Sequence, residues 1–161
     1  MNRRLSEMKH LVGGTGATFS AKATIVNPLG NLRHIEKSEL GKTLPFSEIY
    51  FSEIKPKIVK AWKFHSRQEQ NICVAFGEIR IICVKEMPDG TIFEVFELDS
   101  VALHGVLTIP ARIYYALVNT SEKVTTLLNA TDLPHESAEN LSLPREFPEF
   151  EAILIEFGGS K

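Results

Sequence analysis

Residues 59–69 read VKAWKFHSRQE, a β-type run that leads into a polar turn. Successive side chains of a strand point to opposite sides of a sheet. We therefore expect Lys63 and His65 on one face and Trp62 and Phe64 on the other. A cation, an imidazole and the acidic residue that ends the stretch would then converge inside a barrel. The alternative is that Lys63 and His65 face solvent on a half-exposed sheet.

Similar short runs, separated by turn residues, continue on both sides of this stretch. Strands are expected at residues 47–53, 58–64, 71–75, 78–85, 91–98, 106–109, 113–118 and 125–130. Pro88-Asp89-Gly90 predicts a hairpin, because proline presets φ and glycine adopts backbone states closed to other residues. Strands do not alternate with helical patterns, so the sequence favours an all-β sandwich or barrel over a parallel sheet.

Composition limits the class of protein. The 161 residues, 43% of them hydrophobic, suit one soluble domain with a sizeable core. The 18 basic residues nearly balance the 20 acidic ones, so no long-range positive field is expected to collect nucleic acid or anionic lipid. Any anionic ligand must therefore be held by a few local side chains.

Three further features bear on location. The apolar runs are far too short to span a membrane, and the basic start MNRRLSEMKH lacks the apolar segment of a secretory signal. Cys73 and Cys83 both lie in apolar, strand-like runs. We expect them to be reduced core thiols, which is typical of a cytoplasmic protein.

The two ends of the chain are less regular. Gly13-Gly14-Thr15-Gly16-Ala17 lacks the lysine and the flanking elements of a phosphate-binding loop, so it is interpreted as a flexible loop. Residues 133–148 are rich in proline and glutamate and lead to an apolar run at residues 150–157. That run is expected to be one more strand or a segment that packs against a partner subunit.

A second segment, residues 105–119, reads GVLTIPARIYYALVN. The two segments together resemble the cupin motifs G-x5-H-x-H-x3-4-E-x6-G and G-x5-P-x-G-x2-H-x3-N. The matching positions are Lys63, His65, Glu69 and Gly77 in the first motif, and Gly105, Pro110, Arg112, Tyr115 and Asn119 in the second. This resemblance implies a double-stranded β-helix, or jelly-roll barrel, as one domain spanning residues 1–161. Its core would span about residues 45–132, with strands and a loop before it and a tail at 133–161.

Within the cupins, the chain resembles the dTDP-4-dehydrorhamnose 3,5-epimerase family. That family has strands written F-x-Q-x-N-x-S and V-[IL]-R-G-L-H-Y-Q, then an R-G-E turn, an I-P-P-G segment and a late T-x-D. This sequence has FSEIYFS at residues 46–52, VKAWKFH at 59–65, FGE at 76–78, IPAR at 109–112 and ATD at 130–132. The resemblance covers about residues 45–145.

Several catalytic positions of the family carry other residues here. The base histidine falls on Lys63, the glutamine after it on His65, and the lysine of the third strand near Gln70. The general-acid tyrosine falls on Leu128, and the histidine of the I-P-P-G segment falls on Tyr115. The aspartate that partners the base has no evident counterpart at residues 141–144.

These substitutions leave several chemical assignments open. Removal of a proton next to a ketone needs a base, an acid on the opposite face and a group that stabilises the enolate. His65 can exchange protons near neutral pH. Lys63 is a base if burial lowers its pKa, and otherwise a charged enolate stabiliser. Tyr114 or Tyr115 can replace the missing acid; only one of them can point inward, and Tyr115 is at the motif position.

The resemblance implies two sets of site residues. The expected catalytic residues are Lys63, His65 and Tyr115. The expected substrate-binding residues are Glu48, Tyr50, Lys60, Glu69, Asn71, Arg112 and Asn129. No cofactor is expected. A metal is also not expected, because only His65 and Glu69 among the cupin motif positions are metal-ligand types.

The implied function is metal-independent epimerisation or isomerisation of a nucleotide-linked 4-keto-6-deoxyhexose in cell-surface polysaccharide biosynthesis. The alternative is a catalytically silent cupin that binds a sugar or sugar nucleotide. A third hypothesis is a metal-dependent dioxygenase or sugar-phosphate isomerase. The expected partners are the sugar ligand and a second copy of the chain in a homodimer, since members of the family pair their barrels, with neither nucleic acid nor membrane.

Overall fold

The computed structural model describes residues 14–36, 46–88, 90–134, 140–142 and 148–157. The described part of the chain is mostly β-strand. The elements are β1 (Thr18–Ala21), β2 (Thr24–Ile25), β3 (Leu32–Arg33), β4 (Glu48–Ile54), β5 (Val59–His65), β6 (Gln70–Phe76), β7 (Glu78–Met87), β8 (Gly90–Asp99), β9 (Gly105–Ile109), β10 (Tyr114–Val118), β11 (Thr125–Thr131), β12 (Asn140–Ser142) and α1 (Pro148–Phe157). All the predicted strands are present, and their ends differ from the prediction by no more than two residues.

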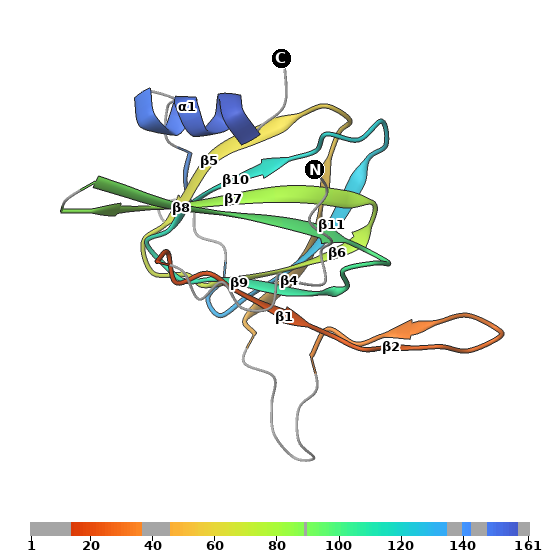
Figure 1. The fold of residues 1–161 in the computed structure, drawn as a ribbon. Helices are drawn as coiled ribbons and strands as arrows, with labels where there is room; N and C mark the ends of the chain where they lie inside the picture. Colours follow the sequence, from red (N-terminus) through yellow and green to blue (C-terminus); the bar gives the residue numbers. More distant parts are fainter. Residues whose placement is uncertain (1–13, 37–45, 89, 135–139, 143–147, 158–161) are drawn as a thin grey trace.

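The strands form two five-stranded sheets that face each other (Figure 1). The first sheet has the order β1-β9-β6-β11-β4, and the second has the order β12-β5-β10-β7-β8. Every strand pair is antiparallel, and the predicted hairpin joins β7 to β8 with Met87 opposite Gly90. The chain crosses repeatedly from one sheet to the other, as in a jelly roll, which confirms the predicted all-β barrel.

The main core lies between the two sheets. Tyr115 and Leu117 of β10 and Ile81 and Cys83 of β7 all belong to one buried cluster. These residues are two apart along their strands, so they fix which face of each strand points into the barrel. Both cysteines are buried and unpaired, as the sequence predicted. The same alternation along each strand shows which polar side chains point into the barrel.

The C-terminal apolar run was expected to be one more strand or a segment that packs against a partner subunit, and the first of these alternatives is wrong. It forms α1, which lies on the outer face of the second sheet (Figure 1). Ile153, Leu154 and Phe157 pack there against a second buried cluster that contains Trp62. Their spacing of three and four residues gives a helix one apolar face, and Pro148 suits the first turn of a helix.

The glycine-rich segment is also not simply a flexible loop. Thr15 and Ala17 are buried, while Gly14 and Gly16 have φ angles of 77° and 94°. A Cβ on Gly14 would meet Ile92 Cγ2 at 2.6 Å, so both the conformation and the close approach require glycine. Gly13, like Asp89 of the hairpin turn and most of the tail at 135–147, lies outside the described residues.

The β2–β3 hairpin lies in the segment before the barrel core and projects away from the barrel (Figure 1). Val26 is 81% exposed and Leu29 is 99% exposed, so the hairpin presents aliphatic side chains to solvent. The only described helix is too short to cross a bilayer.

Candidate functional site

The predicted faces of β5 are correct. Lys63 is paired with Tyr115 of β10, and residues paired across antiparallel strands point to the same side, so Lys63 faces the barrel. His65 shares this face because its Nε2 lies 3.2 Å from Tyr115 Oη. Trp62 packs beneath α1, and the Phe64 ring lies 4.6 Å from the Tyr114 ring on the outer side.

A bulge in β5 adds a second lysine to the barrel face. Lys60 is paired with Leu117, whereas Lys63 is paired with Tyr115, so two residues of β5 oppose Ala116 alone. Such a bulge shifts the alternation by one residue. Lys60 and Lys63 therefore point to the same side although they are three residues apart. The Lys60 Nζ donates a hydrogen bond to the Glu53 carbonyl at 2.7 Å.

Lys63 lies in an environment that disfavours its charge. Burial lowers the pKa of the Lys63 ammonium, and the neighbouring positive charge of Lys60 lowers it further. Among the described residues, no carboxylate forms an ion pair with Lys63, and no side chain or carbonyl hydrogen-bonds to its Nζ. The Lys63 amine is therefore available to a ligand that enters the barrel.

His65 and Tyr115 form a buried pair. His65 is 5% exposed and Tyr115 is 3% exposed, and their rings stack with an interplanar angle of 20°. Burial raises the pKa of the Tyr115 phenol, and the proximity of Tyr50 and Cys83 raises it further. Tyr115 is therefore a protonated hydrogen-bond partner that holds the His65 ring in place.

The first sheet supplies the opposite wall of the barrel. Tyr50 of β4 is paired with Asn129 of β11, which is itself paired with the core residue Ile72. Glu48 has the same inward parity as Tyr50. Burial raises the pKa of the Tyr50 phenol, and the nearby Glu48 raises it further. Since no described residue hydrogen-bonds to the Tyr50 hydroxyl, a protonated phenol faces the second sheet.

Two of the expected binding residues lie elsewhere. Asn71 is on the outer face of the first sheet, because its neighbour Ile72 points into the core. Its Oδ1 accepts a hydrogen bond from Thr108 at 2.7 Å, and its Nδ2 donates to Glu69 at 3.3 Å. This bond keeps the Glu69 carboxylate on the outer side as well. The structure therefore does not bring Glu69 and Asn71 together with Lys63.

Arg112 lies beside the site but is exposed. It has a φ of 67° in the turn between β9 and β10, and its backbone N–H donates to the His65 carbonyl at 2.7 Å. The turn is therefore tied to the end of β5 that carries His65. The Arg112 side chain stands at that end of the barrel, where an anionic part of a ligand can reach it.

Two further polar groups point into the barrel that were not among the expected site residues. Glu94 of β8 is paired with Cys83, and it extends the row formed by Lys63, Tyr115 and Cys83 across the second sheet. It accepts a hydrogen bond from the Thr15 hydroxyl. The parity of the β8 residues could have revealed it, because Phe96 and Leu98 lie two and four residues farther along the same buried face.

Gln70, near which the lysine of the family's third strand falls, is the second such group. It is 1% exposed, and its pairing with Thr131 and Ile109 places it inside the barrel. Its amide Nε2 donates to the Gln68 side chain at 2.5 Å, and Gln68 in turn donates to the Leu133 carbonyl at 2.5 Å. The strand that was expected to begin at residue 71 begins one residue earlier and so includes this side chain.

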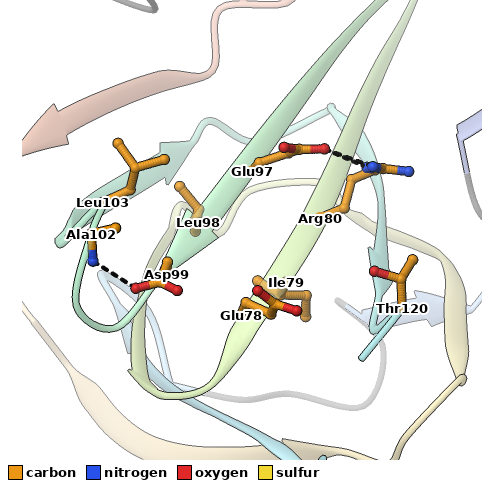
Figure 2. A pocket seen from close by; sticks show the side chains of 9 residues that line it. All are labelled: Glu78, Ile79, Arg80, Glu97, Leu98, Asp99, Ala102, Leu103 and Thr120. Atoms are coloured by element: carbon orange, nitrogen blue, oxygen red, sulfur yellow. Dashed lines mark hydrogen bonds and ion pairs between the residues drawn. The ribbon is translucent and has the colours of Figure 1, made fainter. Parts of the chain in front are cut away.

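Within the described ranges, no three His, Cys, Asp or Glu side chains gather as a metal site would require. A separate cavity of about 280 Å³ opens at the other end of the barrel, beside Glu78 and Thr120 (Figure 2). Three of its charged side chains have partners: Arg80 pairs with Glu97 at 2.6 Å, and Asp99 accepts from the Ala102 N–H at 2.7 Å. These groups serve to hold the strands and the loop, so we assign no ligand to this cavity.

Comparison with known proteins gives a consistent result. No protein-family model matches the chain, and no curated protein matches it by sequence. Among solved structures, it is similar to a dTDP sugar isomerase from Desulfovibrio desulfuricans G20, with 29% identity, 83% of this chain and 87% of that chain covered, and a TM-score of 0.74.

Two more distant structures share the fold. The dTDP-4-dehydrorhamnose 3,5-epimerase from Bacillus anthracis str. Ames, with TDP and PPi bound, is 15% identical over 86% of this chain and 85% of that chain, with a TM-score of 0.71. A 3,4-ketoisomerase from Thermoanaerobacterium thermosaccharolyticum, in complex with TDP-4-keto-6-deoxyglucose, is 16% identical over 79% and 87%, with a TM-score of 0.63. The chain is therefore a cupin jelly roll, and its resemblance to the dTDP-sugar isomerases and epimerases is confirmed.

Proposed function

We propose that this protein is an epimerase or isomerase of a nucleotide-linked 4-keto-6-deoxyhexose, and that it removes a proton from a carbon next to the ketone. The observation that carries the proposal is the placement of proton-transfer groups on facing walls of one barrel. Lys63 and His65 face inward from the second sheet, and Tyr50 faces inward from the first. The dTDP sugar isomerase at 29% identity supports the substrate class.

Removal and return of the proton on opposite sides of the sugar need groups from both sheets of the barrel. A proton next to a ketone becomes removable when a base lies on one side of the carbon and the developing enolate is stabilised. Lys63 or His65 can be the base, while a protonated Lys63 can stabilise the enolate oxygen. Inversion at that carbon further needs a donor on the opposite side of the sugar, and the Tyr50 phenol is placed to be that donor.

The nucleotide diphosphate would be held by a few cations rather than by a broad field. The formal net charge of the chain is −2, so local contacts must supply the attraction. Lys60 lies on the barrel face of β5, and Arg112 lies in the turn that is tied to His65. We assign these two residues to the diphosphate, since arginine suits bidentate phosphate contacts.

We further propose that the protein is a cytoplasmic homodimer that acts in cell-surface polysaccharide biosynthesis. Two exposed apolar surfaces support the dimer. One is the projecting hairpin with Val26 and Leu29, and the other is the outer face of the first sheet, where Phe51 is 66% exposed and Phe76 is 71% exposed. A two-fold axis would let each hairpin cover the sheet face of the partner.

The proposed reaction is tested by incubating TDP-4-keto-6-deoxyglucose with the protein in D2O and measuring deuterium in the recovered sugar by mass spectrometry. We expect incorporation with the wild type and a large loss with Lys63→Ala or His65→Ala. Lys123→Met, which changes an exposed lysine in the turn before β11, should leave the rate unchanged. Binding of 4-keto sugar nucleotides without any incorporation would instead support the silent sugar-nucleotide-binding alternative.

A further inference from the structure

We propose that the Lys63 amine forms a covalent imine with the ketone of the sugar, so that the proton is removed from an iminium ion rather than from a free ketone. This inference rests on the proposed function, because it assumes a keto sugar in the barrel. It assigns to Lys63 a role that neither a simple base nor a charged hydrogen-bond donor would have.

The pairing of the strands places the Lys63 side chain on the inner wall of the barrel. Lys63 is at the β5 end of the row that runs across the barrel wall, paired with Tyr115, and His65 is two residues farther along the same face. Within the described part of the chain, its Nζ has no hydrogen-bond or ion-pair partner that a ligand would have to displace. A primary amine that is half-buried beside an imidazole can both attack a carbonyl and exchange protons with its neighbour.

Imine formation also needs a neutral amine, and the bulge in β5 favours one. Without the bulge, Lys60 would point to the side of Trp62, but with it Lys60 and Lys63 share one face. Burial and the charge of Lys60 lower the pKa of Lys63. A desolvated lysine beside another cation is the established way in which proteins obtain a nucleophilic amine near neutral pH.

Other titratable groups face the same space, and they determine how imine formation by Lys63 depends on pH. On the second sheet these are His65, Tyr115, Cys83 and Glu94, and on the first sheet they are Glu48 and Tyr50. The pKa of the Tyr115, Tyr50 and Cys83 groups is raised, so these three are neutral at pH 7 and add no charge beside the amine. Neither carboxylate forms an ion pair with Lys63 that would hold it in the charged form.

The proposed steps balance without a further reactant. The neutral Lys63 Nζ adds to the carbonyl carbon, and a proton moves from nitrogen to oxygen to give a carbinolamine. Protonation of the hydroxyl, with His65 as the proton carrier, releases one water and leaves the iminium ion. The positive nitrogen then withdraws electrons while the proton on the adjacent carbon is removed, giving an enamine. Reprotonation and addition of one water return the ketone and the free lysine.

Trapping tests this directly. The wild type is incubated with TDP-4-keto-6-deoxyglucose and sodium cyanoborohydride, which reduces an iminium ion in preference to a ketone. We expect the protein mass to rise by the mass of the sugar nucleotide less one oxygen atom, with the adduct mapped to the peptide that contains Lys63. Lys63→Arg keeps the charge and cannot form an imine, so it should show no adduct. Lys57→Met, which changes an exposed lysine at the other end of the barrel, should be labelled like the wild type.

The possible outcomes distinguish a failure of the imine proposal from a failure of the proposed function. Deuterium incorporation by the wild type without an adduct on Lys63 would overturn the imine and leave the proposed function standing. An adduct on Lys63 without deuterium incorporation would support the imine and count against the proton transfer. Lys60→Met gives a further check at saturating sugar nucleotide, since Lys60 is also assigned to the diphosphate: it should lower trapping at pH 7, and trapping should recover as the pH is raised. Equal trapping by Lys60→Met and wild type at every pH would contradict the role given to Lys60.

Discussion

His65 Nε2 lies 3.2 Å from Tyr115 Oη, and the two side chains come from neighbouring strands of the same barrel wall. Both are almost fully buried, so each is the natural partner of the other. This pair fixes where the imidazole stands relative to Lys63. It also changes the expected role of Tyr115 from a proton donor to a positioning residue, because its hydroxyl is directed to His65.

Removal of the Tyr115 hydroxyl tests that role. Tyr115→Phe leaves a buried imidazole nitrogen without its partner, so we expect the free energy of unfolding to fall by about 1–3 kcal/mol. Deuterium exchange should slow and its pH profile should shift, because the position and the proton affinity of His65 both change. Tyr114→Phe alters the neighbouring tyrosine on the outer face and should leave the profile unchanged. A pH profile of Tyr115→Phe that matches the wild type would show that the pair has no part in proton transfer.

Tyr50 is expected to donate the proton on the opposite side of the sugar. Tyr50→Phe should still incorporate deuterium, because the base on the other wall is intact. Formation of the inverted sugar should fall by roughly 100-fold or more, the usual contribution of a general acid. Both quantities can be read from one NMR time course in D2O. Equal losses of exchange and of inversion would mean that Tyr50 only binds the sugar.

Burial of the Lys63 amine should cost stability at neutral pH. Its pKa is lower in the folded protein than the usual value of 10.5, so the unfolded chain binds more protons at neutral and mildly alkaline pH. Stability from this group therefore rises with pH between the folded pKa and 10.5. We expect Lys63→Met to be more stable than the wild type at pH 7, with a gain that shrinks towards pH 10. Urea unfolding at both values measures this, and a gain that grows with pH would contradict it.

Helix α1 is expected to support the strand that carries Lys63. Ile153 is 9% exposed and packs in the cluster that contains Trp62, whereas Ile155 is 70% exposed. Ile153→Ala should lower the free energy of unfolding by roughly 2 kcal/mol or more, because it removes buried methylene groups and leaves a cavity. The matched control Ile155→Ala should change it by less than about 0.5 kcal/mol. Equal effects in guanidinium unfolding would show that α1 does not pack as described.

Much of the barrel could be predicted because the local signals agree. The central strands alternate in polarity, and turn residues such as Gly77 and the Pro88 turn separate them. The two-residue alternation and the positions of the turns therefore indicate the same strands. The shared face of Lys63 and His65 followed from that period, whereas the choice between the barrel interior and solvent did not. The strand expected at residues 150–157 was wrong, since a short apolar run of eight residues suits a strand or a helix and only tertiary packing decides.

The side-chain environment of the site was harder to predict. A bulge reverses the face of every residue before it, so the direction of Lys60 depends on pairing with β10 that no local pattern reveals. Glu69 was assigned to the site as a motif position, and Asn71 comes two residues after it. Because Ile72 points into the core, Asn71 points to the outer face of the sheet. Its hydrogen bond keeps the Glu69 carboxylate on that outer face. Glu94 was overlooked although its parity with Phe96 was visible. Register across strands, rather than composition, determines this site.

The most direct test of the proposed reaction is the NMR signal of the sugar proton next to the ketone in TDP-4-keto-6-deoxyglucose, followed in D2O with catalytic amounts of protein. We predict that this signal disappears with the wild type as solvent deuterium replaces the proton, and that it persists with Lys63→Ala and with His65→Ala. A signal that persists with the wild type while the sugar nucleotide is bound would contradict the proposed proton transfer.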